Sequence, residues 1–369
     1  MKKIFAFLCF TAVVIACSSN DEEKVDDNNF DKTALLTNWA DNIIIPSYEN
    51  YQQKINILSA TAATFTAVPN TENLSALRNS WLEAYKAYQY VAIYNIGKAQ
   101  DISFKEISNT FPTSKTGIDE NIASGTYNLN LFPQYTRQGF PGLDYLINGL
   151  GTNDATIVGF YSSNANATNY KNYLTAVIAK MKANADAIVT DWNGGFRDSF
   201  ISNNGSTNSG SFSKITNNFI KSFERDIRSG KVGIPAGLFS EGTRPEDVEA
   251  FYKNDVSKEL LNISLQAAQE FFNGKHFGSD ATGESLKSYL DYMNAVRNGQ
   301  KLSDIINNQF TTIFSATSAL GNSLSQQVTT DNSKMLTAHD ALQQNLIYLK
   351  LDMVLALKIS IDYVDGDGD

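Results

Sequence analysis

The segment GFPGLD, Gly139 to Asp144, places an acid beside residues that let a backbone approach another molecule closely. Gly139 and Gly142 carry no side chain, and Pro141 has a φ already fixed near the helical value. Apolar residues then recur at helical spacing, so Pro141 and Asp144 would lie near a helix start, where proline is tolerated and an acid is favoured. Two interpretations follow. The segment is only a helix start, or it is one wall of a ligand groove with Asp144 as the polar contact.

Other side chains that commonly carry catalysis or bind metals are few. The two histidines, His276 and His339, lie in different segments and lack the HExxH spacing of zinc peptidases. Beyond Cys17 the chain has no cysteine, which excludes disulfides and cysteine-ligated metals there. We find no G-x-S-x-G elbow and no phosphate-binding glycine motif. Hydrolase and nucleotide-binding functions therefore lack their usual support, and the sequence identifies no metal ligands.

The charge of the chain bears on its partners. The net charge is −9 and no cluster of lysine and arginine interrupts it, so nucleic acid is not expected as a partner. Near the C-terminus Asp365, Asp367 and Asp369 alternate as calcium ligands do, but no bidentate acid follows them. We expect residues 363–369 to form a disordered acidic tail.

The first residues read as a targeting signal. Lys2 and Lys3 precede an apolar run, residues 4–16, that is too short to span a bilayer stably. The run ends in VIAC, which resembles a bacterial lipobox and implies cleavage before Cys17 and lipidation of its thiol. Residues 17–30 are polar and acidic, as in a flexible tether, and resemble surface-export signals of Bacteroidetes lipoproteins. We therefore expect an outer-membrane lipoprotein that is held by acyl chains, and the export-like signal favours its display at the cell surface.

Helical periodicity dominates the remainder, and alternating strand-like runs are nearly absent. The pattern predicts a long helix over residues 31–67, kinked at Pro46, and another over residues 71–97. Pro245 and Gly274 have the residue types that open and close a helix, so a single helix is predicted between them. A last long helix follows the leucines from residue 342 to residue 357.

A stretch rich in glycine, serine and asparagine, residues 193–213, divides the chain into two helical halves. It is predicted to be a polar loop between an N-terminal bundle, residues 31–192, and a C-terminal bundle, residues 214–362. The expected fold class is all-α, with two antiparallel helical bundles and a groove between them.

The residues described so far resemble the imelysin family, also called the M75 peptidase family, whose motif is G-x-H-x-x-E. Gly139 to Asp144 match that motif. Phe111 stands where a related family segment has tryptophan. The further segments that resemble family members are SWLEAYKAYQYVAIYNIG, NTFPTSKTGIDENI, KVGIPAG, VEAFYKNDVSKELL, FFNGKHFG and NLIYLKLDMVLALKISIDYVDGDGD.

The resemblance implies paired helical bundles, a motif near the groove between them, and a link to iron or haem acquisition at the cell surface. In the family pattern an imidazole and a carboxylate share one helix face and could hold a metal or move a proton. Here Pro141 replaces the histidine, and Asp144 is one methylene shorter than the glutamate. A single carboxylate binds a transition metal poorly.

Three functions are compatible with these observations. The first is a non-catalytic surface lipoprotein that binds a ligand, iron or haem among the candidates, in the groove. The second is a metal-dependent peptidase that draws its ligands from elsewhere, such as His276, His339, Glu224, Asp226 or Asp340. The third is a docking lipoprotein that works with an outer-membrane receptor or transporter.

Overall fold

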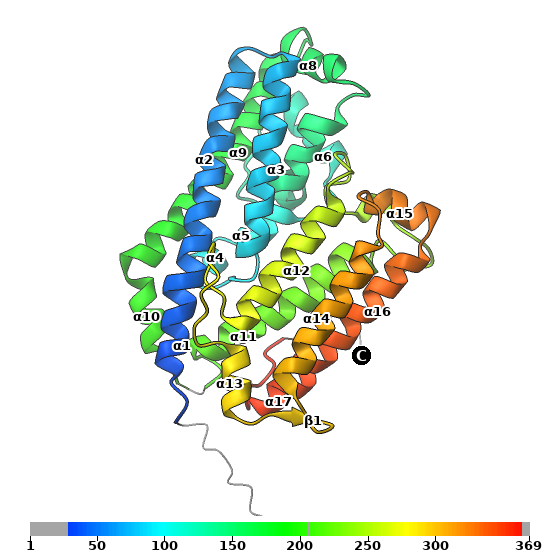
Figure 1. Ribbon diagram of the computed structural model, residues 1–369. Helices are drawn as coiled ribbons and strands as arrows, with labels where there is room; N and C mark the ends of the chain where they lie inside the picture. Colours follow the sequence, from blue (N-terminus) through cyan, green and yellow to red (C-terminus); the bar gives the residue numbers. More distant parts are fainter. Residues whose placement is uncertain (1–28, 206, 364–369) are drawn as a thin grey trace, which may run out of the picture.

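The computed structural model describes residues 29–205 and 207–363, and helices make up most of it (Figure 1). The expected signal peptide, Cys17, the tether as far as residue 28 and the acidic tail beyond Tyr363 lie outside the described residues. The prediction of an all-α fold is confirmed. In the described part of the chain the strands are β1 (Val296–Arg297) and β2 (Gln300–Lys301), which form one short antiparallel pair. No helix among these residues is both long and apolar enough to cross a bilayer.

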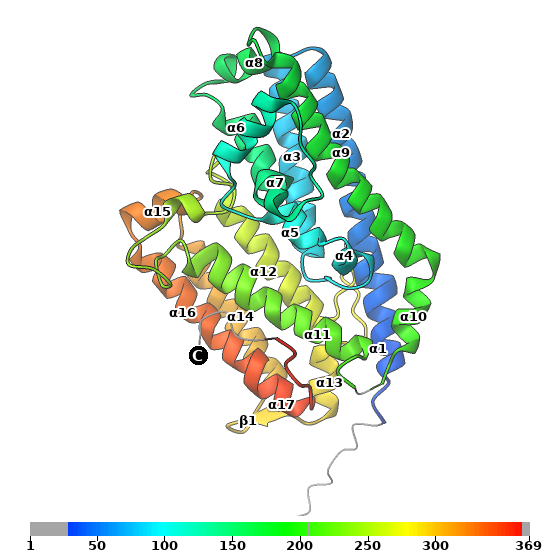
Figure 2. The ribbon, with the colours of Figure 1, turned by 180° about the vertical axis from the view of Figure 1, so that it is seen from behind.

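The first half of the chain forms a bundle with short helices at one side. Its elements are α1 (Lys32–Asn38), η2 (Trp39–Ile44), α2 (Ile45–Ala67), α3 (Thr71–Val91), α4 (Lys98–Asp101), α5 (Phe104–Asn109), α6 (Lys115–Ser124), η3 (Phe132–Arg137), α7 (Gly139–Asp144), η4 (Tyr145–Gly149), α8 (Asp154–Ser162) and α9 (Ala167–Asp191). The long helices α2, α3 and α9 lie side by side in both views (Figures 1 and 2).

The second half forms a second bundle, built on α12, α14, α16 and the helix made by α11 and η6. Its elements are α11 (Ser211–Lys221), η6 (Ser222–Gly233), η7 (Pro245–Asp247), α12 (Ser257–Asn273), α13 (Leu286–Tyr292), α14 (Leu302–Ser318), α15 (Leu324–Thr330), α16 (Ser333–Ile347), η8 (Tyr348–Met353) and α17 (Val354–Ala356). Before them, η5 (Trp192–Phe196) and α10 (Arg197–Ser202) continue from α9 and pack on the first bundle, α10 against α1.

The first predicted helix is present, and its irregularity lies just before the proline. Residues 39–44 are π-helical, and Pro46 lies in the first turn of α2. Proline has no N–H to donate to the carbonyl four residues earlier, which belongs to Asn42. The N–H of Phe277, in the loop after α12, donates to that oxygen at 2.8 Å. The missing donor is thus replaced by one from the second half of the chain.

The polar stretch 193–213 is more helical than its composition suggests. A π-helical turn, η5, and α10 occupy residues 192–202, and α11 begins at Ser211. Among the described residues of this stretch, the backbone is non-helical at 203–205 and 207–210, and at Gly195 within η5, whose φ is +123°. Phe196 and Phe200 explain the difference, because both stack edge-on against Trp192 and hold this segment on the bundle. The division into residues 31–192 and 214–362 remains a prediction from chain order.

The two halves share apolar core at the base of the first helix. The Trp39 ring lies parallel to Phe212 at 5.8 Å between centroids and contacts Phe271 at 4.9 Å. Asn38 donates through Nδ2 to the carbonyl of Glu284 at 3.0 Å. Further along, α12 packs against α3. The motif helix α7 lies close to this junction, beside α3 and α5 (Figure 2).

Candidate functional site

The motif segment forms the short helix α7, and its first residue has a conformation suited to glycine. Gly139 has a φ of +69°, and an added Cβ would lie 2.3 Å from the carbonyl oxygen of Ser108. Pro141 lies in the first turn, as the sequence predicts for a proline. Phe140 stacks on Tyr85 with centroids 4.3 Å apart. All six residues of α7 are buried, which fixes the position of Asp144.

Asp144 is a buried carboxylate that holds a segment from the other half of the chain. Its Oδ2 accepts the N–H of Tyr252 at 2.8 Å, and its Oδ1 accepts the N–H of Lys253 at 2.9 Å. The side chain of Asn148, one turn later, also donates to Oδ1, at 3.0 Å. Only 1% of Asp144 is exposed. The acid of the motif therefore pairs with backbone that would otherwise lack partners.

That backbone belongs to a segment whose predicted structure is wrong. We expected one helix from Pro245 to Gly274, but helix α12 begins only at Ser257, and η7 is a single 3-10 turn. Between them, residues 248–256 form an irregular strap. Ala250 has a φ of +57° and Asn254 one of +67°, and neither conformation continues a right-handed helix. The strap is stabilised by tertiary partners such as Asp144, which local periodicity does not reveal.

The environment of Asp144 changes its acidity. Burial raises the pKa of this carboxyl to about 7, and the hydrogen bonds from Tyr252, Asn148 and Lys253 oppose the rise without cancelling it. A carboxyl with such a pKa can change its protonation state near neutral pH. Perturbed acids of this kind gather at functional sites and in buried structural networks alike.

A cavity of about 210 Å³ lies beside Asp144 at the junction of the two halves. Pro141 and Asp144 form one side of it, and Phe111 and Pro112 form another. The strap closes it with Val248, Ala250, Phe251 and Tyr252. The structure thus brings Pro141 and Asp144 to a hollow between the bundles, with Gly139 behind them against the backbone of Ser108.

A second buried polar network crosses the junction next to the strap. Lys231 of η6 forms an ion pair with Glu249 of the strap, and both side chains are at least 95% buried. From the first half, Gln89 accepts from Lys231 at 3.0 Å and Asn109 donates to Glu249 at 2.8 Å. Burial, with the carboxylates of Glu249 and Asp144 nearby, raises the pKa of Tyr85 well above its usual value. The charges of this pair are fully enclosed by groups from both halves.

Comparison with known proteins identifies the family. The family model for imelysin, peptidase family M75, matches residues 44–351. The chain belongs to the imelysin family. A search of curated protein sequences returns no significant match.

Two crystal structures share the imelysin fold with this chain. One is an imelysin-like protein from Psychrobacter arcticum 273-4, 17% identical, with a TM-score of 0.69 over 90% of this chain and 97% of that one. The other, from Parabacteroides distasonis ATCC 8503, bears the provisional name iron-regulated protein A precursor. It is 15% identical, with a TM-score of 0.72 over 92% of this chain and 97% of that one. At these identities the likeness shows the fold.

The side chains that the sequence offered as metal ligands of a peptidase site either pair with other residues of this chain or lie in separate segments. Glu224 accepts from Lys350 at 2.9 Å and from Tyr363 at 2.7 Å, and Asp226 pairs with Lys105 at 2.5 Å. His276 lies in the loop after α12, and His339 lies in α16 next to Asp340, whose side chain is 85% exposed. Within residues 29–205 and 207–363, no three His, Cys, Asp or Glu side chains form a group able to hold a metal.

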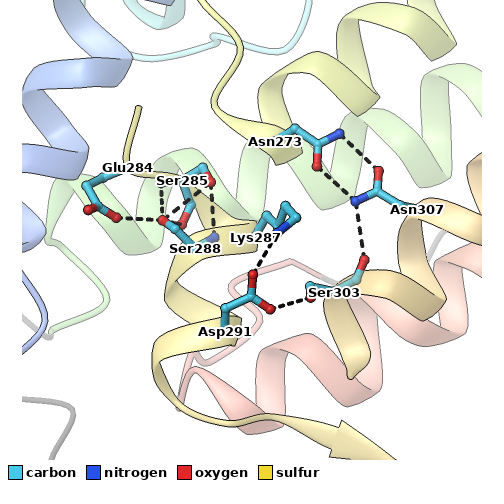
Figure 3. Close-up of polar contacts among 8 residues, drawn as sticks. All are labelled: Asn273, Glu284, Ser285, Lys287, Ser288, Asp291, Ser303 and Asn307. Atoms are coloured by element: carbon cyan, nitrogen blue, oxygen red, sulfur yellow. Dashed lines mark hydrogen bonds and ion pairs between the residues drawn. The ribbon is translucent and has the colours of Figure 1, made fainter. Parts of the chain in front are cut away.

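A wider hollow, about 590 Å³, lies on the second bundle between α12 and α13. Figure 3 shows how polar side chains around it bond to one another. Asp291 accepts from Lys287 at 2.7 Å and from Ser303 at 2.5 Å, and Asn273 and Asn307 exchange two amide bonds. These bonds tie both α13 and α12 to α14, so we assign this network to structure.

The sequence did not single out Lys231 and Glu249, although both lie in segments that resemble the family. Lys231 and Glu249 are 18 residues apart and lie in different elements, so no periodic pattern in the sequence indicates that they form an ion pair.

Proposed function

We propose that this imelysin-family chain is a non-catalytic outer-membrane lipoprotein that binds a ligand or partner protein in iron or haem acquisition. The proposal that the protein is not an enzyme rests on the two residues that stand at the histidine and glutamate positions of the motif. Pro141 supplies neither a proton nor a ligand atom where an imidazole would stand, and both oxygens of Asp144 bind the backbone of the strap.

Two observations support a ligand at the junction. The 210 Å³ cavity is bounded by both halves of the chain, and such junctions are common positions for binding sites. Asp144 Oδ2 accepts one hydrogen bond, and a carboxylate oxygen can accept two. The link to iron rests on the family resemblance and on the name of the Parabacteroides distasonis protein.

The membrane location is supported by the N-terminal sequence alone. Val14, Ile15 and Ala16 precede Cys17 after a short apolar run, and the acidic tether follows. Thioether-linked acyl chains on Cys17 would hold the folded domain at the outer membrane, where a receptor or transporter is the expected protein partner.

The ligand is tested with the mature lipidated chain in detergent. Its thermal unfolding is followed with haem, ferrous iron, ferric iron, calcium or zinc, alongside the Asp144→Asn variant. A ligand that binds only the folded state at about a hundred times its dissociation constant should add about 2.7 kcal/mol of stability. We expect haem or an iron ion to stabilise the wild type and to lose that effect in Asp144→Asn.

Two further measurements separate the alternatives. Mass spectrometry of the N-terminus should show acyl chains on Cys17, and replacement by alanine should abolish them. Incubation with an unfolded protein substrate should yield no cleavage. Chelator-sensitive proteolysis by the pure protein would instead establish the metal-dependent peptidase.

A further inference from the structure

One end of the molecule carries three exposed apolar side chains, which we call the apolar end. Val296 lies in β1, and Leu351 and Leu355 lie one turn apart in the helix made by η8 and α17. Their exposed fractions are 66%, 61% and 80%. The hairpin meets this helix there, because Arg297 forms an ion pair with Asp352. Single exposed apolar residues are common, whereas several on adjoining elements are typical of a contact surface.

The described part of the chain begins at the same end. Phe30 stacks on Tyr289 of α13 with ring centroids 4.0 Å apart, and its ring lies 5.4 Å from that of Tyr292. Both views place the start of α1, α13, α17 and β1 at one end of the molecule and α8 at the other (Figures 1 and 2). The chain from Cys17 to Asn29 can span at most about 45 Å. Acyl chains on Cys17 would therefore hold this end of the molecule near the bilayer.

The charge of the apolar end suits a phospholipid surface. The whole chain has a net charge of −9, yet the hairpin residues 294–301 include no acid, and Lys301 among them is exposed. In residues 351–360 the single acid is Asp352, which the hairpin neutralises, and Lys358 is exposed. Lipid phosphates would therefore meet little negative charge on these two segments.

We propose that the apolar end rests on the bilayer that holds Cys17, with Val296, Leu351 and Leu355 in the interfacial region of the lipid. The proposal rests on the membrane location that is part of the proposed function. Three apolar side chains bind a bilayer weakly by themselves. A tether raises their effective concentration at the surface, so a small contact is enough to orient the molecule. In this orientation α8 points away from the membrane (Figure 1).

The test holds the chain on a membrane without relying on natural acylation. A Cys17→Ala chain with an N-terminal histidine tag is bound to vesicles of phosphatidylethanolamine, phosphatidylglycerol and a nickel-chelating lipid. Beyond Cys17 the chain has no cysteine, so Leu355→Cys carries a single NBD fluorophore. Val68→Cys is the matched label, because Val68 is 59% exposed and follows α2 at the far end (Figure 1).

We expect the label at position 355 to shift its emission to the blue on vesicles. Iodide should quench it at least about threefold less than in solution, because the label enters the membrane interface. The label at position 68 should change in neither respect. Equal quenching of the two labels on vesicles would overturn the proposal. So would protection of position 355 in solution that grows with protein concentration, which would assign the apolar end to a second copy of the chain.

An added charge tests whether the apolar end itself makes the contact. Leu351→Asp, at an exposed position, should restore full quenching of the label at position 355, because a carboxylate disfavours the interface. Val68→Asp should leave the protection unchanged. A label that stays protected in Leu351→Asp contradicts the assignment.

The proposed function is tested separately from this surface. Mass spectrometry of the natural chain reports on acylation of Cys17, and thermal unfolding reports on the ligand. Membrane contact by the tagged chain together with an unacylated Cys17 would reject the natural anchor and still support the apolar end as a lipid-binding surface. An acylated Cys17 without protection at position 355 would support the anchor and overturn this inference.

Discussion

Asp144 shows how one carboxylate can serve local and long-range structure together. Asp144 is the last residue of α7, beyond the first turn in which the sequence had placed it, and its local contact is the hydrogen bond from Asn148 at 3.0 Å. Its two oxygens hold the strap more than a hundred residues away in sequence. Replacement of the motif histidine by Pro141 leaves this bonding intact, because the strap is recognised through backbone N–H groups. The residue is thus a structural contact of the junction, whatever it binds in addition.

The first prediction concerns the pH dependence of stability. The native state binds the Asp144 proton more tightly than the unfolded chain does, because burial raises the pKa from 3.8 to about 7. The contribution of this group is therefore complete below about pH 4 and is lost as pH rises through 7, a loss of roughly 4 kcal/mol. Urea unfolding between about pH 4 and pH 8 should show this decline in the wild type, and a flatter profile in Asp144→Asn.

A matched variant controls for general charge effects in that experiment. Glu241 is exposed at the surface, so Glu241→Gln should keep the wild-type pH profile. Parallel profiles for the wild type and Asp144→Asn would show that Asp144 does not titrate in this range.

The second prediction concerns the Lys231–Glu249 pair. Lys231→Met leaves a carboxylate that is 98% buried without its cation, and should cost about 3–5 kcal/mol of unfolding free energy. Adding Glu249→Gln to this variant removes the buried charge and should recover most of the loss. A cost below about 1 kcal/mol for Lys231→Met alone would show that the pair is solvated in solution.

At the scale of elements, the strap and α7 depend on each other. Within the strap the backbone forms turn hydrogen bonds, such as that from the N–H of Asn254 to the carbonyl of Ala250 at 2.7 Å, and no continuous helix. In α7, Gly139 lets the chain pass the carbonyl of Ser108 and so places Asp144 beside the strap. The first residue of the motif helix, Gly139, must therefore be glycine.

The third prediction follows from that close approach. Gly139→Ala should lower the free energy of unfolding by at least about 2 kcal/mol, because its φ is +69° and the new Cβ would lie 2.3 Å from a backbone oxygen. Gly194→Ala is the control, since a Cβ added there would meet nothing within 4 Å and its φ is not positive. This control should change stability by no more than about 0.5 kcal/mol. Equal denaturation midpoints for the two variants would contradict this account of Gly139.

At the scale of the molecule, the two bundles are joined by continuous core. The first helix belongs to the N-terminal half of the chain, yet Trp39 packs against Phe212 and Phe271 of the C-terminal half. The helices α3 and α12 meet beside the buried ion pair. Separating the bundles would expose both apolar rings and enclosed charges.

The fourth prediction is that the bundles unfold together. Urea unfolding followed by far-ultraviolet circular dichroism and by tryptophan fluorescence should give coincident transitions. Trp39 reports on the shared core, while Trp81 and Trp192 report on the first half and the segment after it. Two resolved transitions would show that the halves are independent folding units.

The sequence determined the features that depend on local pattern. Apolar residues at helical spacing specified the all-α fold, and GFPGLD specified a helix start with proline in its first turn. The same reasoning wrongly predicted a helix between Pro245 and Ser257, where residues that are compatible with a helix form a 3-10 turn and the strap. Helix propensity acts over a few neighbouring residues. In the strap it was outweighed by the hydrogen bonds that Tyr252 and Lys253 donate to Asp144.

The tertiary structure alone decided which polar groups meet. Asp144 and Tyr252, and likewise Lys231 and Gln89, come from segments remote in sequence. No spacing rule connects such residues, because their distances are set by how two bundles pack. That packing also distinguishes the bonded carboxylate of the motif, Asp144, from Asp247, whose Oδ1 is buried without a hydrogen-bond partner among the described residues.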